Sequence, residues 1–183
     1  METTSSIKEA IVAKQDGKHL VFLLCGSSYG IPILEVSDIN GLMEITPIPK
    51  APEFIKGVIN HRGKVIPVMD LRLKFGMPVK EYDKQTCIII VNLFIHNKAK
   101  QIGVIVDTVS EVFDIPLSEI EALPSYGSSV EDDFLNGIGK VKGKLVVLLN
   151  IAKVLHSDDV IKLLTDKKDN AVDAEIEVLN GMD

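Results

Sequence analysis

Tryptophan is absent from this 183-residue chain, which has only three tyrosines and six phenylalanines. Proteins that bind single-stranded nucleic acid stack bases on aromatic side chains, so the chain is poor in the groups that this function needs. No apolar run approaches the ~20 residues that a membrane-spanning helix requires, and we expect no direct membrane insertion. The N-terminal residues also lack the basic and apolar segments of a secretory signal peptide.

Cysteine is scarce as well, with Cys25 and Cys87 as the two examples. Both lie in apolar segments of the kind that form strands. We interpret them as two buried thiols of a cytoplasmic protein rather than as a disulfide, because disulfides are rare in reducing compartments.

Positive charge is not concentrated in the body of the chain. The formal net charge is −6, and the segment from residue 166 onward, with six acids and two bases, contributes −4 of it. Residues 1–165 therefore carry a net charge of only −2. Because non-specific nucleic-acid binding needs concentrated positive charge, this near-neutral body argues against nucleic acid as a partner.

Residues that could form a catalytic or metal site do not cluster in the sequence. No pair of histidines has a metal-binding spacing, and no Gly-x-Ser-x-Gly segment is present. Gly57, Gly63 and Lys64 superficially match a phosphate-binding loop, but their spacing is wrong and a strand rather than a helix should follow. The sequence therefore predicts a binding scaffold with no cofactor and no metal, and not an enzyme.

One stretch, residues 57–75, shows the local organisation most clearly. Its sequence, GVINHRGKVIPVMDLRLKF, predicts a strand, a tight turn, a second strand and a short helix. Gly63 can adopt the positive φ that such a turn often requires. Asp70 is placed to cap the helix and Gly76 to end it.

The same unit appears again 80 residues later, as GIGKVKGKLVVLLNIAKVL at residues 137–155. Gly137 takes the place of Gly57, and Asn150 takes the place of Asp70 as the expected helix cap. Two further segments, residues 29–39 and 102–112, resemble each other at an offset of 73. The chain therefore contains two related β units, and internal similarity of this kind outweighs local propensity.

The difference between these offsets predicts a seven-residue insertion in the second unit, within the polar loop at residues 125–133. Short β-rich segments separated by Gly and Pro favour two small barrels of about five strands each. Ser118 and Glu121 have capping-box spacing, so we expect one helical turn there. Ser157 should cap a final helix at residues 158–164 that packs on the barrels.

Several segments in series identify a family. Gly-Val-Ile-Asn-His-Arg-Gly at residues 57–63, followed by Val-Ile-Pro-Val-Met-Asp-Leu-Arg at residues 65–72, resembles the signature of the CheW-like coupling proteins of bacterial chemotaxis. The resemblance covers the chain from about residue 19 to residue 164. Further matching segments fall in the family's order at residues 29–31, 51–57, 102–107 and 137–139.

The resemblance implies a mainly β fold with two five-stranded, SH3-like β-barrels that share a core, short helices and a C-terminal helix. The CheW-like domain would span residues 18–165, between a flexible N-terminal lead at 1–17 and a disordered acidic tail at 166–183. It also implies a cytoplasmic, non-enzymatic adaptor in receptor arrays at the inner membrane. Its partners would be the cytoplasmic tips of methyl-accepting chemotaxis receptors and the regulatory domain of the histidine kinase CheA.

The resemblance also implies site residues, with the receptor tip in a groove between the barrels. Val36 and Ile39 match apolar groove positions, and Val112 matches a position on the facing barrel. Gly57 matches a position where a Cβ would obstruct close approach, and Arg62 matches a basic residue beside the groove. Receptor binding would therefore weaken more than stability in Gly57→Asp.

The residues alone leave alternatives open for these positions. The apolar ones are equally consistent with ordinary core, and Gly57 is consistent with a β-bulge. Arg62 is consistent with a structural ion pair to Asp70 or Glu53. On the kinase side, Met43 and Ile45 are predicted to make contact at the far end of the first barrel.

One position departs from the family, because His61 stands where the family usually carries Leu. We expect His61 to be an exposed turn residue. The alternative function is a small-barrel nucleic-acid-binding protein, which a salt-dependent gel shift with single-stranded DNA or RNA would reveal.

Overall fold

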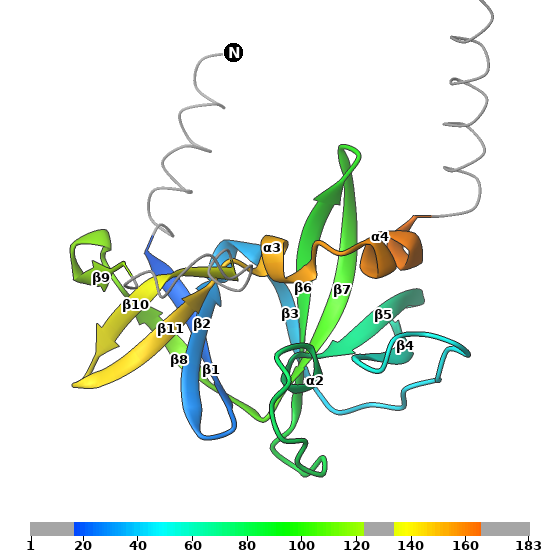
Figure 1. The fold of residues 1–183 in the computed structure, drawn as a ribbon, viewed down its shortest axis with the longest axis horizontal. Helices are drawn as coiled ribbons and strands as arrows, with labels where there is room; N and C mark the ends of the chain where they lie inside the picture. Colours follow the sequence, from blue (N-terminus) through cyan, green and yellow to red (C-terminus); the bar gives the residue numbers. More distant parts are fainter. Residues whose placement is uncertain (1–16, 123–133, 166–183) are drawn as a thin grey trace, which may run out of the picture.

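The computed structural model describes residues 17–122 and 134–165. Figure 1 shows two β-rich halves side by side, with the short helices placed between and across them. The strands are β1 (Lys18–Leu24), β2 (Ser27–Pro32), β3 (Val36–Gly41), β4 (Ile55–His61), β5 (Lys64–Asp70), β6 (Cys87–Ile95), β7 (Lys98–Val106), β8 (Thr108–Asp114), β9 (Ile120–Glu121), β10 (Leu135–Val141) and β11 (Lys144–Leu149). The helices are the 3-10 turns η1 (Ile33–Glu35) and η2 (Leu117–Glu119) and the α-helices α2 (Leu71–Lys74), α3 (Ile151–Leu155) and α4 (Asp158–Leu164).

The strands form two mixed sheets, which we call the first and second barrel although neither sheet closes on itself through pairing of its two outer strands. The first barrel has the strand order β3-β6-β7-β5-β4, and the second barrel has the order β8-β1-β2-β11-β10-β9. This confirms the predicted mainly β fold with two small barrels, short helices and a C-terminal helix. The second barrel has a sixth strand because the two-residue β9 pairs with β10.

Each barrel combines strands from both sequence repeats. The β6–β7 hairpin of the second repeat completes the barrel built from β3, β4 and β5, and the β1–β2 hairpin completes the barrel built from β8 to β11. Two parallel strand pairs make these joints, with Val68 opposite Gly103 in one and Leu148 opposite Gly30 in the other. These positions match at the offsets of 80 and 73, so each of the two repeats gives its first hairpin to the barrel of the other.

The two glycines at these joints allow the strands to approach closely. A Cβ on Gly103 would lie 3.2 Å from Cγ2 of Val68, and a Cβ on Gly30 would lie 3.0 Å from Cδ2 of Leu148. Glycine inside a strand often marks such an approach. The exchange of hairpins therefore depends on residues that the repeat preserves in both copies.

A shared hydrophobic core lies between the barrels, and each barrel also has a small interior core. Along β6, Ile88 and Ile90 face the interior of the first barrel, whereas Ile89 and Val91 belong to the shared core. Along β1, Leu20 and Phe22 lie in the shared core and Val21 in the second interior. Strands buried on both faces need a continuous apolar run, which explains the sequence CIIIV in β6.

The bulges in β4 and β10 explain why both copies of the repeat have a glycine, Gly57 and Gly137, at the same position. Gly57 and Gly137 have φ values of 143° and 142°, and the strand register shifts beside each of them. A Cβ on Gly57 would collide with the backbone carbonyl oxygen of Thr46, and a Cβ on Gly137 would lie 2.7 Å from that of Glu121. The β-bulge interpretation of Gly57 is therefore correct, and a side chain there disturbs the chain's own fold.

A buried charged network joins α2 to both halves of the molecule. Arg72 is 1% exposed and contacts Asp70 through Nη2 at 3.0 Å and Asp107 through Nη1 at 2.9 Å. The Tyr82 hydroxyl donates to Asp70, and Asp107 accepts the backbone N–H of Cys25 in the β1–β2 turn. Burial raises the pKa of the Tyr82 hydroxyl, and its hydrogen bond to Asp70 raises it further. Every charge in this network is paired, as burial demands.

Three of the four predicted helix caps are present. Asp70 accepts from the N–H of Arg72, Asn150 from that of Lys153 and Ser157 from that of Val160. The predicted turn near Ser118 exists as η2, but Pro116 precedes it and no side chain caps it. A 3-10 turn of three residues leaves fewer free N–H groups than an α-helix, so the capping box is not needed.

The cysteine prediction is wrong for one residue. Cys25 is exposed, because it lies in the β1–β2 turn with a φ of 49°, whereas Cys87 is partly buried at the start of β6. The two thiols are free, as predicted. The expected lead, tail and inserted loop lie outside the described residues. Within the described part of the chain, no helix is long and apolar enough to cross a membrane.

We expect Gly57→Ala and Gly137→Ala each to lower the free energy of unfolding by about 3 kcal/mol, because both add backbone strain and displace a carbonyl group. Gly63→Ala is the matched control, since its φ is also positive but a Cβ there meets no atom within 4 Å. Gly63→Ala should lower the free energy of unfolding by about 1 kcal/mol. Urea unfolding curves measure all three, and equal losses would contradict the role of the two carbonyl contacts.

Candidate functional site

An ion cluster around Asp38 bridges the two edge strands of the first barrel. Oδ2 of Asp38, on β3, lies 2.9 Å from Nε2 of His61 and 3.1 Å from Nη2 of Arg62. His61 ends β4, and Arg62 follows it in the hairpin turn with a φ of 53°. Because β3 and β4 are the outer strands of this sheet, side chains rather than backbone hydrogen bonds hold the barrel together at this seam.

These contacts correct one prediction and one of the alternatives left open by the sequence. His61 is 9% exposed, so it is a buried partner of Asp38 and not an exposed turn residue. Arg62 pairs with Asp38, whereas the sequence suggested Asp70 or Glu53. The hydrogen bond from His61 is the main cause that lowers the pKa of the Asp38 carboxyl, and the backbone N–H of Ile39 and the charge of Arg62 act in the same direction.

The second barrel has the same seam with different residues. Nζ of Lys142, in the β10–β11 turn, lies 3.5 Å from Oε1 of Glu111 on β8. Lys142 corresponds to Arg62 at the offset of 80, and Glu111 corresponds to Asp38 at the offset of 73. The counterpart of His61 is Val141, so only the first barrel has a histidine in this cluster.

The predicted receptor residues fall into separate environments. Ile39 is 40% exposed on β3 next to Asp38, and Val112 is 45% exposed on β8. They occupy equivalent positions in the two barrels. Val36 is partly buried against the shared core, so its ordinary-core interpretation is supported.

The structure brings Gly57 together with a predicted kinase residue. Cγ2 of Ile45 would lie 3.0 Å from a Cβ on Gly57, and both Ile45 and Met43 pack partly buried against the interior core of the first barrel. The bulge at Gly57 therefore positions the segment that carries Met43 and Ile45. Their contact with a kinase stays a prediction.

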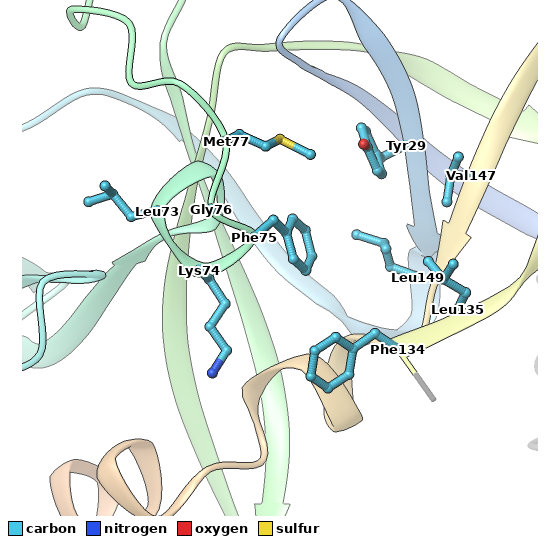
Figure 2. A pocket seen from close by; sticks show the side chains of 10 residues that line it. All are labelled: Tyr29, Leu73, Lys74, Phe75, Gly76, Met77, Phe134, Leu135, Val147 and Leu149. Carbon is cyan, nitrogen blue, oxygen red and sulfur yellow. The ribbon is translucent and has the colours of Figure 1, made fainter. Parts of the chain in front are cut away.

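A mainly apolar pocket of about 570 Å³ lies between the two barrels. Figure 2 shows Phe75 and Met77, which follow α2, facing Tyr29 and Leu149 of the second barrel across it. The rings of Tyr29 and Phe75 stack with centroids 6.5 Å apart. The remaining lining residues are Leu73, Lys74, Gly76, Phe134, Leu135 and Val147.

None of the five predicted receptor residues lines this pocket. The sequence did contain a signal for this pocket. Phe75 and Met77 are large apolar residues beside Gly76, which ends the helix, and residues at such a helix end are usually exposed. Their partners on β2 and β11 come from remote parts of the chain, so their convergence depended on the exchange of hairpins. Among residues 17–122 and 134–165, no three His, Cys, Asp or Glu side chains are placed to hold a metal ion.

The sequence profile of the CheW-like domain matches residues 18–159, which includes both barrels and the start of α4. The chain belongs to the CheW-like family. Chemotaxis protein CheW of Klebsiella aerogenes is 35% identical over 140 residues, which is 76% of this chain and 82% of that protein. Chemotaxis protein CheW of Bacillus subtilis is 32% identical over 145 residues, which is 79% of this chain and 90% of that protein.

A solved structure supports the same relationship. The scaffolding protein TtCheW from Thermoanaerobacter tengcongensis superposes with a TM-score of 0.70 at 35% identity, covering 81% of this chain and 99% of that one. The two barrels are accordingly of the SH3-like type of this family. The CheW-like family is a non-enzymatic family.

The Asp38 cluster predicts an acid-dependent stability. Because the pKa of Asp38 is lowered in the folded state, its stabilisation is complete above the unfolded-state pKa of about 3.9 and is lost as the pH falls through the lower folded value. His61→Leu should raise the pKa of Asp38 more than Arg62→Ala does, because the His61 hydrogen bond is the larger cause.

Carboxyl-carbon NMR titration of both variants measures this pKa. Asp83, whose pKa is lowered mainly by the backbone N–H of Gln85, should titrate unchanged and serves as the internal control. A pKa of Asp38 that stays low in His61→Leu would show that the histidine does not hold this carboxylate.

Proposed function

We propose that this protein is an adaptor that couples the cytoplasmic tips of methyl-accepting chemotaxis receptors to the regulatory domain of the histidine kinase CheA. The observation that carries the proposal is the apolar pocket between the two barrels. The family profile covers both of these barrels. The receptor side and the kinase side would use different surfaces of one fixed barrel pair.

An inter-barrel pocket suits a helical receptor tip. Helices bind in grooves through apolar side chains spaced by three or four residues, and the lining of this pocket is mostly aromatic and aliphatic. Lys74 is the one charged residue among the lining residues, and its Nζ lies 4.5 Å from the ring of Phe54. The pocket therefore offers an apolar floor with a positive charge at one side.

Ile39 and Val112 provide a second candidate receptor surface. These side chains are 40% and 45% exposed, so changing them should cost the fold little stability. Each can still bury apolar surface against a partner. Asp38 and Arg62 lie beside Ile39 and could contribute charged contacts at the edge of such an interface. The two candidate surfaces can be separated by mutation.

The kinase side is proposed at the open end of the first barrel. Met43 and Ile45 lie on the segment that precedes β4 and remain partly exposed over the interior core. The segment is fixed by the pairing of Thr46 with Val58. A rigid, partly apolar barrel end is a suitable surface for a second barrel of the same fold.

We expect Ile39→Asp and Val112→Asp each to weaken binding of a receptor-tip fragment at least tenfold, because a desolvated carboxylate replaces an apolar contact. Binding to the isolated CheA regulatory domain should be unchanged, and Arg62→Ala should also retain it. Isothermal calorimetry with both partners measures these affinities. Leu117→Asp is the matched control, since Leu117 is 86% exposed on η2.

Met77→Glu tests the inter-barrel pocket in the same assay. Loss of receptor binding in Met77→Glu alone would place the receptor in the pocket and not on the Ile39 and Val112 surface. If the unmodified protein binds neither partner at tens of micromolar, the adaptor proposal is wrong. A salt-dependent shift of single-stranded RNA by the same protein would then favour the nucleic-acid alternative.

A further inference from the structure

A second pocket, of about 560 Å³, lies where α3 and α4 meet the β6–β7 hairpin and η1. This region is in the upper centre of Figure 1. We call it the α3 pocket. Most of its lining is apolar, and it includes Leu34, Phe94, Ala152 and Ile161. It shares no lining residue with the inter-barrel pocket.

One carboxylate in the α3 pocket has an unused acceptor. Glu35 lines the pocket, and its Oε2 is buried without a hydrogen-bond partner. Burial raises the pKa of this carboxyl. A buried carboxylate oxygen that accepts no hydrogen bond is unfavourable, so a hydrogen-bond donor that reaches it would stabilise the site.

The internal repeat shows what fills the corresponding place in the other half. At the offset of 80, Ala152 on α3 corresponds to Arg72 on α2, and at the offset of 73, Leu34 corresponds to Asp107. In the first half the guanidinium of Arg72 fills this place, bonded to Asp107 at 2.9 Å and to the carbonyl oxygen of Lys80 at 3.0 Å. In the second half Ala152 leaves the space open.

In the second half the carboxylate lies one position later in the sequence than in the first half. Leu34 is the counterpart of Asp107, and the neighbouring Glu35 brings a carboxylate to the same pocket. The first half supplies the arginine with two acids, Asp70 and Asp107, whereas the second half has Asn150 in place of Asp70 and supplies the carboxylate of Glu35 without an arginine. We propose that the α3 pocket binds an arginine side chain of a partner polypeptide, with the guanidinium paired to Glu35.

Arginine fits this site better than lysine. Its planar guanidinium offers several donors to a carboxylate and is more weakly hydrated than an ammonium group, so it enters a partly buried pocket at lower cost. Its three methylene groups can pack against Leu34, Phe94 and Ile161. The site is separate from the proposed receptor and kinase surfaces, and the inference does not depend on either.

The first test is an NMR titration with N-acetyl-L-arginine N-methylamide as the probe. We expect millimolar binding that shifts the methyl signals of Ala152 and Ile161, with binding about tenfold weaker in Glu35→Gln. Glu53→Gln, at an exposed position, is the matched control and should bind as the unmodified protein does. The lysine analogue of the probe should bind more weakly.

Equal binding to Glu35→Gln, or shifts that are spread over the surface, would overturn the proposal. Because Gln is isosteric and Oε2 of Glu35 has no hydrogen-bond partner, Glu35→Gln should melt no earlier than the unmodified protein, which would show that its fold is intact. If changing Lys167 and Lys168 to serine shifts the same methyl signals, then the chain's own lysines occupy the pocket and the partner arginine is excluded.

The second test builds the missing arginine into the chain. Ala152→Arg should raise the melting temperature by a few degrees and abolish probe binding, and the stability gain should disappear in the double variant with Glu35→Gln. Ala152→Met controls for filling the pocket without charge. A gain in Ala152→Arg that is independent of Glu35 would contradict the proposed pairing.

Discussion

Parallel pairing of β5 with β7 and of β2 with β11 is the constraint on which the rest of this structure depends. Each pair joins a hairpin from one repeat to a barrel from the other, so neither barrel can form from a single contiguous half of the chain. Gly30 and Gly103 allow these strands to approach. The Arg72 network reinforces the joint, because it connects α2 to Asp107 and, through Asp107, to the β1–β2 turn. The two barrels are therefore joined by strand pairing, by a shared core and by this ion network.

Differences between the two repeats mark the surfaces where function is proposed. The repeat preserves the bulge glycines, the helix caps and the seam ion pairs, which all serve the fold. It does not preserve the histidine beside Asp38, the arginine of α2, or the aromatic residue that follows it. Where the two copies diverge, the structure has a carboxylate bonded by a histidine at one seam, an apolar pocket between the barrels and a buried carboxylate oxygen without a hydrogen-bond partner in the α3 pocket.

Local sequence signals predicted the elements well and their partners poorly. The 57–75 unit and its repeat identified the hairpins, the caps at Asp70 and Asn150, and the existence of two barrels. They could not reveal the exchange of hairpins, because β2 and β11 are more than a hundred residues apart and parallel pairing has no local signature. The exchange of hairpins also hid the lining of the inter-barrel pocket, and the pairing of Arg62 with Asp38 was missed because it depends on the two outer strands of the curled sheet meeting. The sequence left Gly57 open between a contact position and a β-bulge, and its φ of 143° shows the bulge, whereas its contact with a receptor stays a prediction.

The proposed adaptor must hold both of its proposed partners at the same time, and a ternary binding measurement tests that directly. Sedimentation velocity on this protein mixed with a receptor-tip fragment and a CheA regulatory domain should show one species that contains all three. A rigid barrel pair with separate surfaces predicts that each partner binds with the other already present at an affinity unchanged within a few fold. If the receptor fragment instead displaces the kinase domain, the two partners share one surface and the account of a coupling scaffold is contradicted.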